Sequence, residues 1–505
     1  MIHRFFHSTR RLRGVVCLLI GGALFALPVD AQVALSPSLK DKTEPAEPAS
    51  PVKTLTVTAA AQPDPMLRYR FWPAPETRRQ QNPAALISRA VLLATNATPE
   101  AKKRFNDYYV EWSDVPLSDL PVDEARKVLA GYESSLLELQ RAENFMVIDY
   151  DLHLDGLTAN ELIQTLLPEF QEMRQLGRLL HLRARVAVIE GRWEDAVHDI
   201  RVGFRLAEFA GHSTDFLVGR LVGFAIGGLM MNVVEEAIQQ PGCPNMYWAL
   251  SGLPAERLFE TKQALEFESV LMARLFQFGD DLPDEPIGSE AAREKIKQLI
   301  QEANRTLMSA DVGNGIGSTT QLMAGVYVIS LTEPSRELLA GTAEWNGRVD
   351  QLSSAEAVLR ATLLKFARVR DRWVAWSTLP DEAWDEYEEE RKAAFSASKF
   401  DGDVLISLVN MLLPAVEAAR KAGFRTQQQH HFLATVEALR MHASKTGELP
   451  QKLDGLRPVP AWSDALSGNA FDYQRISPTE ATLIRTPRYP NDPETNFSIK
   501  LRGTK

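Results

Sequence analysis

The histidines of the segment HHFLATVEALRMH (430–442) are the side chains best suited to hold a metal ion. On a helix, His431 and His442 would lie about 16 Å apart along the axis, and His430 and Glu437 about 10 Å apart. One ion cannot bridge such distances, and the chain has neither an HExxH sequence nor a paired CxxC. The sequence therefore predicts no metal site, and no pattern in it indicates a cofactor.

Glycines and acids form two further patterns that could serve chemistry. The segment DVGNGIGSTT (311–320) is rich in glycine, but it lacks the preceding strand and the lysine of a phosphate-binding loop. Acidic residues gather in DDLPDEP (280–286) and DEAWDEYEEER (381–391) without the spacing of an EF-hand. The chain also lacks GxSxG, and Cys243 has no nucleophile signature around it, so we expect a small buried thiol there. We predict no catalytic residue, although carboxylates assembled by the fold have no fixed spacing and leave a hydrolase open.

The loop PGCPNMYWAL (241–250) is the segment most suggestive of binding. Asn245, Tyr247 and Trp248 combine a polar group with two large aromatic surfaces, a composition typical of binding hot spots. The alternative is structural: Pro244 and Asn245 would cap the next helix while the two aromatic rings pack in the core. We take Asn245, Tyr247 and Trp248 as the candidate interaction residues.

Length and charge bound the class of protein. The 505 residues suffice for two to four domains, and the net charge is −10. No basic tract follows the N-terminus, so nucleic acid is not expected as a partner.

The first residues resemble an export signal. Basic residues precede a short apolar run, VVCLLIGGALFAL (15–27), and small residues at 29–31 fit cleavage after Ala31. An uncleaved anchor is the competing interpretation. Removal of residues 1–31 takes away four arginines and Asp30, so the net charge falls to −13 and Cys243 is the one cysteine left. We expect an exported protein without an intrachain disulfide and without a membrane span after cleavage.

The elements beyond the signal divide into three parts. Residues 32–66, rich in proline and alanine, predict a disordered or extended spacer. Residues 67–425 carry helical periodicity almost throughout and predict an all-α body. Residues 426–505 predict a small α+β module, with a helix over 426–447 and strands near 471–475, 481–485 and 496–501.

Two parts of the helical body carry sharper signals. The segment 182–208 resembles a tetratricopeptide-like hairpin, in which Gly191 closes the turn, Trp193 packs and Ala196 keeps the helices close. The apolar helix expected near 215–238 carries Gly219, Gly223 and Gly227 at a spacing of four, which places them on one face. Glycine weakens a helix by roughly 1 kcal/mol relative to alanine, so we expect a closely packed neighbour there and a buried core helix. The fold class is mainly α: an irregular helical array plus the C-terminal module.

Two resemblances add to these patterns. The run with GELPQKLDGL and DALSGNAFDY is similar to the globular part of type II secretion major pseudopilins, although the chain lacks a prepilin processing site. RVAVIEGRWEDAVHDIRVGFRLAEFAG, IQQPGCPNMYWALSGLP and LLKFARVRDRWVAWSTLP resemble an uncharacterised family of exported helical proteins of planctomycete-type bacteria. That resemblance spans roughly 67–485 and implies architecture and export but no activity.

Together these observations favour an exported, non-enzymatic interaction or scaffold protein whose partner is another envelope protein. An envelope hydrolase with carboxylates assembled by the fold, and a pseudopilin-like secretion assembly factor, are the alternatives.

Overall fold

The computed structural model describes most of the chain from residue 52 onward. The described residues are 52–113, 115–150, 159–214, 216–267, 282–307, 316–379, 387, 389–391, 393, 413–487 and 495–503. The expected signal peptide and most of the expected spacer lie outside them, as do residues 311–315 and most of the second acidic cluster.

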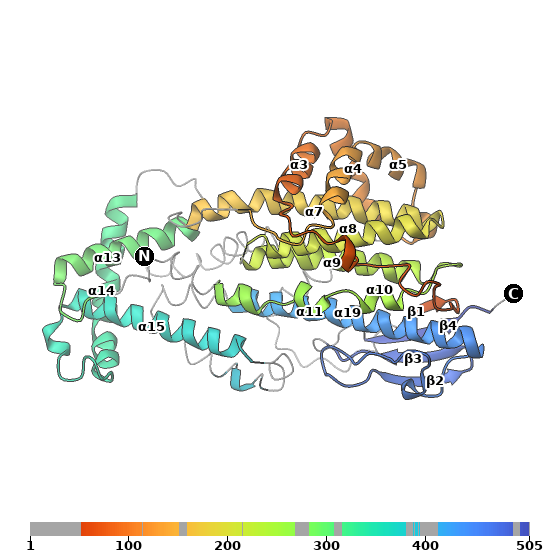
Figure 1. Cartoon of the computed structure of the whole chain (residues 1–505). Helices are drawn as coiled ribbons and strands as arrows, with labels where there is room; N and C mark the ends of the chain where they lie inside the picture. The colour runs from red at the N-terminus through yellow and green to blue at the C-terminus, as the bar shows by residue number, and fades with distance from the viewer. Residues whose placement is uncertain are drawn as a thin grey trace. The chain divides into compact units, whose positions relative to one another are not determined.

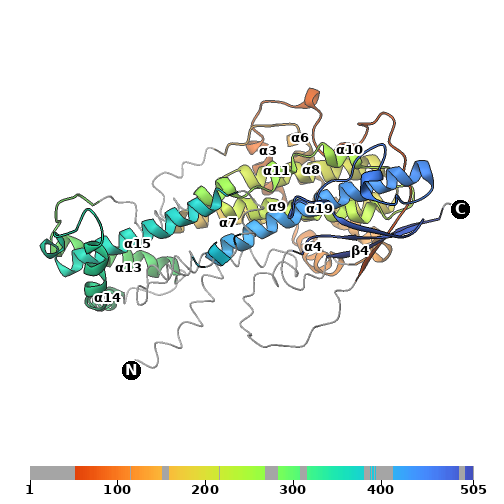
Figure 2. The ribbon, with the colours of Figure 1, turned by 90° about the horizontal axis from the view of Figure 1, so that it is seen from below.

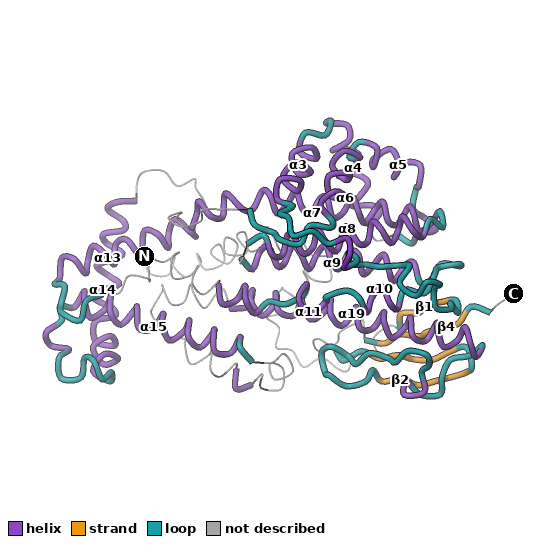
Figure 3. The backbone as a smooth tube through the Cα atoms, viewed as in Figure 1, coloured by secondary structure: helices purple, strands orange, loops and turns teal. Residues whose placement is uncertain are grey.

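The chain is mainly helical with one small sheet (Figures 1 and 3), as the sequence predicts. It forms two compact units. The larger unit comprises Ser36–Leu152, Leu167–Thr261 and Ala419–Lys505, and the smaller comprises Met1–Leu35, His153–Leu166 and Lys262–Ala418. The larger unit contains α3 (Ala84–Thr95), α4 (Pro99–Trp112), α5 (Val122–Ala130), α6 (Glu133–Ala142), α8 (Trp193–His212), α9 (Leu217–Ala237), α10 (Tyr247–Ser251) and α11 (Ala255–Leu258). It also holds most of α7 (Ala159–Ile189) and of α19 (Leu413–Thr446).

A tight turn joins α7 to α8, as the hairpin pattern predicts. Gly191 adopts a φ of +67°, a left-handed conformation that glycine reaches without strain. Ala196 is completely buried, and Trp193 is half-buried. The Arg183 guanidinium on α7 donates to the Asp199 carboxylate on α8, with 2.9 Å between Nε and Oδ1. The two helices therefore form one antiparallel pair.

Helix α9 packs closely on its neighbours at the three glycines expected to allow it. A Cβ at Gly219 would lie 2.8 Å from the carbonyl oxygen of Ala210, and one at Gly223 would lie 2.6 Å from that of Ala207. These carbonyls belong to α8, so the two backbones approach as the sequence predicts. A Cβ at Gly227 would lie 2.6 Å from the Phe259 ring. By length and composition α9 could cross a membrane, but 72% of its most apolar stretch is buried inside the protein.

The sheet draws on both ends of the described chain. Strands β2 (Asp472–Ser477), β3 (Glu480–Ile484) and β4 (Asn496–Leu501) pair antiparallel, close to the predicted positions. The fourth strand, β1 (Lys53–Val57), pairs parallel with β4, giving the order β1-β4-β3-β2. Helix α19 lies against this sheet (Figures 1 and 2), where the Phe432 ring is 4.4 Å from the Phe497 ring, centroid to centroid.

Two boundaries differ from the sequence expectations. Residues 53–57, expected in the spacer, form β1, whose Leu55 and Val57 are completely buried. Their partner β4 lies more than four hundred residues later, so no local pattern could reveal the pairing. The expected division at 425/426 falls inside α19, which runs without interruption from Leu413 to Thr446. The C-terminal module therefore belongs to the same compact unit as α3–α11.

The smaller unit packs α13 (Ser289–Leu307), α14 (Ile316–Ala340) and α15 (Ser354–Ser377). A fully buried carboxylate, Glu356, accepts hydrogen bonds from the backbone N–H groups of Ile287 (2.8 Å) and Gly288 (3.1 Å). One helical turn on, Arg360 donates to the carbonyl oxygen of Pro283, so α15 holds the described end of the first acidic cluster in place by its backbone.

Candidate functional site

The loop 241–250, our candidate for binding, lies against α19 inside the larger unit. The Asn245 amide donates to the backbone carbonyl of Glu437 (2.9 Å), and its oxygen accepts from the N–H of Tyr247 (3.1 Å). The second bond satisfies an N–H that the first turn of α10 leaves free, from the residue just before the N-cap Met246. Asn245 is 2% exposed, so its polar groups are used within the protein.

A buried ion pair on α19 fixes the same loop. Glu437 and Arg440 are both completely buried, and 2.5 Å separates Glu437 Oε1 from Arg440 Nη1. Glu437 also accepts from the N–H of Met246 (3.0 Å), while Arg440 donates to the carbonyls of Cys243 (2.8 Å) and Thr58 (2.9 Å). One pair thus joins α19, the loop and the segment that follows β1.

The aromatic residues of the loop extend this arrangement. The Tyr247 hydroxyl donates to the carbonyl of Pro460 (3.1 Å) and accepts from the indole N–H of Trp462 (3.2 Å). Trp462 in turn packs edge-on against His430 and His431 of α19. Tyr247 is 3% exposed, and Trp248 is half-buried with its indole N–H directed to Gln62 (3.4 Å).

The structure therefore corrects our interpretation of Asn245 and Tyr247 as interaction residues. Both are internal, and their hydrogen bonds end within the larger unit. Part of the Trp248 side chain is exposed to solvent, but the residue is half-buried and its indole N–H is directed to Gln62. The structural alternative weighed for this loop, a cap followed by packed aromatic rings, describes the observed contacts. Cys243 is buried too, and burial raises the pKa of its thiol to about 12, which leaves it protonated at neutral pH.

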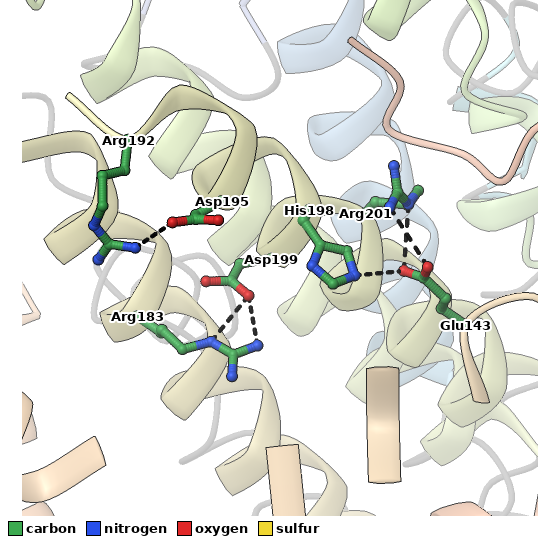
Figure 4. Close-up of polar contacts among 7 residues, drawn as sticks. All are labelled: Glu143, Arg183, Arg192, Asp195, His198, Asp199 and Arg201. Atoms are coloured by element: carbon green, nitrogen blue, oxygen red, sulfur yellow. Dashed lines mark hydrogen bonds and ion pairs between the residues drawn. The ribbon is translucent and has the colours of Figure 1, made fainter. Parts of the chain in front are cut away.

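A second polar cluster lies along α8 and is partly exposed (Figure 4). Glu143, at the end of α6, accepts from His198 Nε2 (3.2 Å) and from Arg201 Nε (3.3 Å). Burial alone would raise the pKa of Glu143, but the bond from His198 and the charge of Arg201 outweigh it and hold that pKa below its usual value. Two separate pairs involve acids of the same helix: Arg183 of α7 with Asp199, and Arg192, just before α8, with Asp195.

The pair of Glu143 and His198 resembles part of a general-base arrangement. A carboxylate can orient an imidazole that takes a proton from a nucleophile. His198 is accessible, with 35% of its side chain exposed. However, within the described part of the chain His198 has no hydrogen bond to a hydroxyl or thiol. The contacts that are present join α6 to α8.

Carboxylates with raised pKa values would mark a site for acid–base chemistry. In the described part of the chain three carboxylates have such values, two of them buried and one, Glu236, with 27% of its side chain exposed. Burial raises the pKa of Asp199, Glu236 and Glu437 above the usual range. Each is bonded to a different arginine, respectively Arg183, Arg185 and Arg440. The guanidinium charge stabilises the ionised carboxylate in each case and opposes the effect of burial. These groups therefore act as partners in ion pairs.

Residues that the sequence did not single out carry most of these contacts. A charged residue in a helical pattern is normally predicted to face solvent. Three such residues instead have side chains that are 0–1% exposed: Arg440, Arg185 and Glu356. Their one sequence signal is a charge on the apolar face of an amphipathic helix, and Arg440, between Leu439 and Met441, is the clearest example.

Comparison of the chain with models of protein families, with curated proteins and with solved structures gave no match.

Proposed function

We propose that the protein is an exported, non-enzymatic interaction or scaffold protein of the cell envelope. The observation that carries this proposal is the pairing of the three carboxylates with raised pKa values: Asp199, Glu236 and Glu437 are each bonded to an arginine. Such pairs hold side chains and the elements that carry them in a fixed arrangement.

A scaffold needs a surface for its partner, and α14 offers exposed apolar side chains. Val326 and Ile329 are 59% and 82% exposed, and three residues along a helix place them on the same face. Ile329 has the largest exposed fraction among the exposed large apolar residues of the described chain. We propose that this face contacts an apolar surface of an envelope protein, since buried aliphatic side chains contribute roughly 1.5–3 kcal/mol each.

Export and binding are tested with the full chain, expressed with its own N-terminus. Export predicts that the chain recovered from the envelope fraction begins at Gln32, which intact mass measures directly. A protein recovered in the cytoplasm with residues 1–31 attached would contradict this part of the proposal.

For binding, we would compare the wild-type chain with Val326→Ser/Ile329→Ser and with a matched control, Leu92→Ser/Leu137→Ser, which removes exposed apolar side chains from α3 and α6. Each folded variant is immobilised and exposed to envelope extract. A defined protein retained by the wild type and the control but lost from the α14 variant supports the proposal. Equal retention by all three chains, or none, overturns it.

The hydrolase alternative has one observation in its favour, the accessible pair of Glu143 and His198. It predicts that the purified chain hydrolyses esters, peptides or glycosides, and that His198→Gln removes this activity without unfolding the protein. A measured turnover that depends on His198 would replace the scaffold proposal.

A further inference from the structure

Helix α7 carries four basic side chains on one face. Arg174, Arg178, His181 and Arg185 are separated by four, three and four residues, a spacing that aligns them along a helix. Tyr109 and Trp112 of α4 lie beside this face: the Tyr109 hydroxyl is 3.3 Å from His181 Nδ1, and Arg185 donates to the carbonyl of Trp112 at 2.7 Å.

At one end of this row of four basic residues, the charge and the donors of Arg185 are all paired. Arg185, 1% exposed, donates to both carboxylate oxygens of Glu236, at 2.8 and 2.9 Å, and to the carbonyls of Trp112 and Val115. Its positive charge is thus matched by one carboxylate and its donors by four acceptors. This is what a buried guanidinium needs, because it cannot lose its charge at neutral pH.

At the other end of the row, Arg174 has no counter-charge of this kind among the described residues. Arg174 is only 9% exposed, and among the buried arginines of the described chain it alone has no hydrogen bond, ion pair or ring contact. Its charged neighbour is a second cation, Arg178, whose guanidinium carbon lies 5.3 Å from the centre of the Tyr109 ring. Within the described residues Arg178 makes a single hydrogen bond, a long one of 3.5 Å to the neutral Gln175.

Among the described residues, no carboxylate pairs with Arg174. Burial lowers the pKa of His181 to about 3, so this imidazole is neutral at pH 7. Burial and the charge of Arg178 lower the pKa of Arg174 to about 9, which is the direction expected of a cation without a counter-charge. Arg174 and Arg178 lie one helical turn apart, the first largely buried and the second partly exposed, and both carry guanidinium N–H donors of the kind that phosphate and carboxylate groups accept.

We propose that Arg174 and Arg178 bind an oxyanion, the phosphate or carboxylate group of a small molecule, beside Tyr109. The bound anion supplies the counter-charge that Glu236 supplies to Arg185. This binding activity is independent of the scaffold role and of the α14 face, so either proposal stands if the other fails.

The test measures thermal unfolding of the full chain at neutral pH in sodium phosphate, sodium acetate and sodium chloride of equal ionic strength. A ligand that binds only the folded chain raises the unfolding temperature, and the rise grows with the logarithm of its concentration. We expect a rise in phosphate, in acetate or in both, relative to chloride, and the more effective salt identifies the preferred oxyanion. Equal unfolding temperatures in all three salts would overturn the proposal.

Variants locate the effect. Arg174→Gln and Arg178→Gln each lose the response, while Arg104→Gln, which removes the same charge from an exposed position of α4, keeps it. Without an anion, Arg174→Gln unfolds at the same temperature as the wild type or higher, because an uncompensated buried charge is gone. Loss of the response in Arg104→Gln, or a large fall in stability of anion-free Arg174→Gln, would show a non-specific or purely structural role. If Arg174→Gln does not fold, the test uses Arg178→Gln, since Arg178 is partly exposed. Calorimetric titration with phosphate or acetate then compares this variant with the wild type, and equal binding by both chains overturns the proposal.

Discussion

The carboxylate of Glu437 and the guanidinium of Arg440 lie 2.5 Å apart within α19, and neither side chain has any exposed surface. Through this pair the helix reaches the carbonyls of Cys243 and Thr58 and the N–H of Met246. Segments separated by almost four hundred residues in sequence are therefore joined at one buried point.

Removal of one member of this pair leaves the other charged and without its counter-charge. We expect Glu437→Gln to reduce the free energy of unfolding by about 3–5 kcal/mol, since breaking a buried pair strands the remaining charge. Urea titration followed by circular dichroism measures the change. Glu448→Gln is the control, because Glu448 pairs with Arg475 with 48% of its side chain exposed, and such pairs contribute about 1 kcal/mol or less. A similar loss in both variants would contradict this assignment.

Two glycines of α9 give a second matched comparison. A Cβ at Gly223 would lie 2.6 Å from the carbonyl oxygen of Ala207, whereas a Cβ at Gly228 would meet nothing within 4 Å. We expect Gly223→Ala to lower the unfolding temperature because α8 must move away. Gly228→Ala should leave it unchanged or raise it, since alanine favours helix by up to about 1 kcal/mol. Differential scanning calorimetry decides, and a stabilised Gly223→Ala chain would mean that α8 and α9 do not approach as closely as described.

The helical elements could be predicted from sequence because their determinants are local. Periodic apolar residues mark α7–α9, and Gly191 and Gly223 lie where a turn and a close approach require them. Strand β1 was not predicted because its determinants are not local. Its five residues follow a proline-rich segment, and their partner lies at the far end of the chain. A strand this short is defined by its pairing, which composition does not record.

The site residues were harder to predict than the fold. Asn245 and Tyr247 have the composition of a binding loop, but the same polar and aromatic groups suit a buried junction equally well, and α19 covers them. Arg174 gave no signal, because an arginine on a helix reads as solvent-exposed unless the neighbouring helix is known. Burial and pairing depend on which elements meet, and one sequence does not fix those contacts.

Stability should fall as the solution becomes acidic. Burial lowers the pKa of His181 and His212 to about 3 and that of His430 to about 4, against about 6.5 in the unfolded chain. Their neutral forms therefore stabilise the fold fully above pH 6.5, and this stability is lost as pH falls toward the folded-state values. Each of these three histidines contributes up to about 1.4 kcal/mol per pH unit in that window.

Urea titrations at pH 7 and pH 5.5 measure this dependence. The carboxylates with raised pKa values, Asp199, Glu236 and Glu437, act in the opposite direction, because the folded chain binds their protons more tightly, so they reduce the net loss of stability. The comparison of His430→Gln with His442→Gln, a half-buried residue of the same helix, isolates one buried histidine. We expect a smaller pH dependence in His430→Gln than in the wild type or His442→Gln. Equal unfolding free energies of the wild type at the two pH values would contradict the prediction.

Strand β1 makes the N-terminal segment part of the fold, and this can be tested at Leu55. Its side chain is completely buried, while Thr54 is exposed on the same strand. We expect Leu55→Ala to reduce the free energy of unfolding by about 2–5 kcal/mol, the usual result of truncating a buried leucine. Thr54→Ala should change it by about 0.5 kcal/mol or less, as surface substitutions usually do. If both variants unfold with the wild-type free energy in urea, residues 53–57 are a spacer, as the sequence suggests, and β4 forms an edge of the sheet.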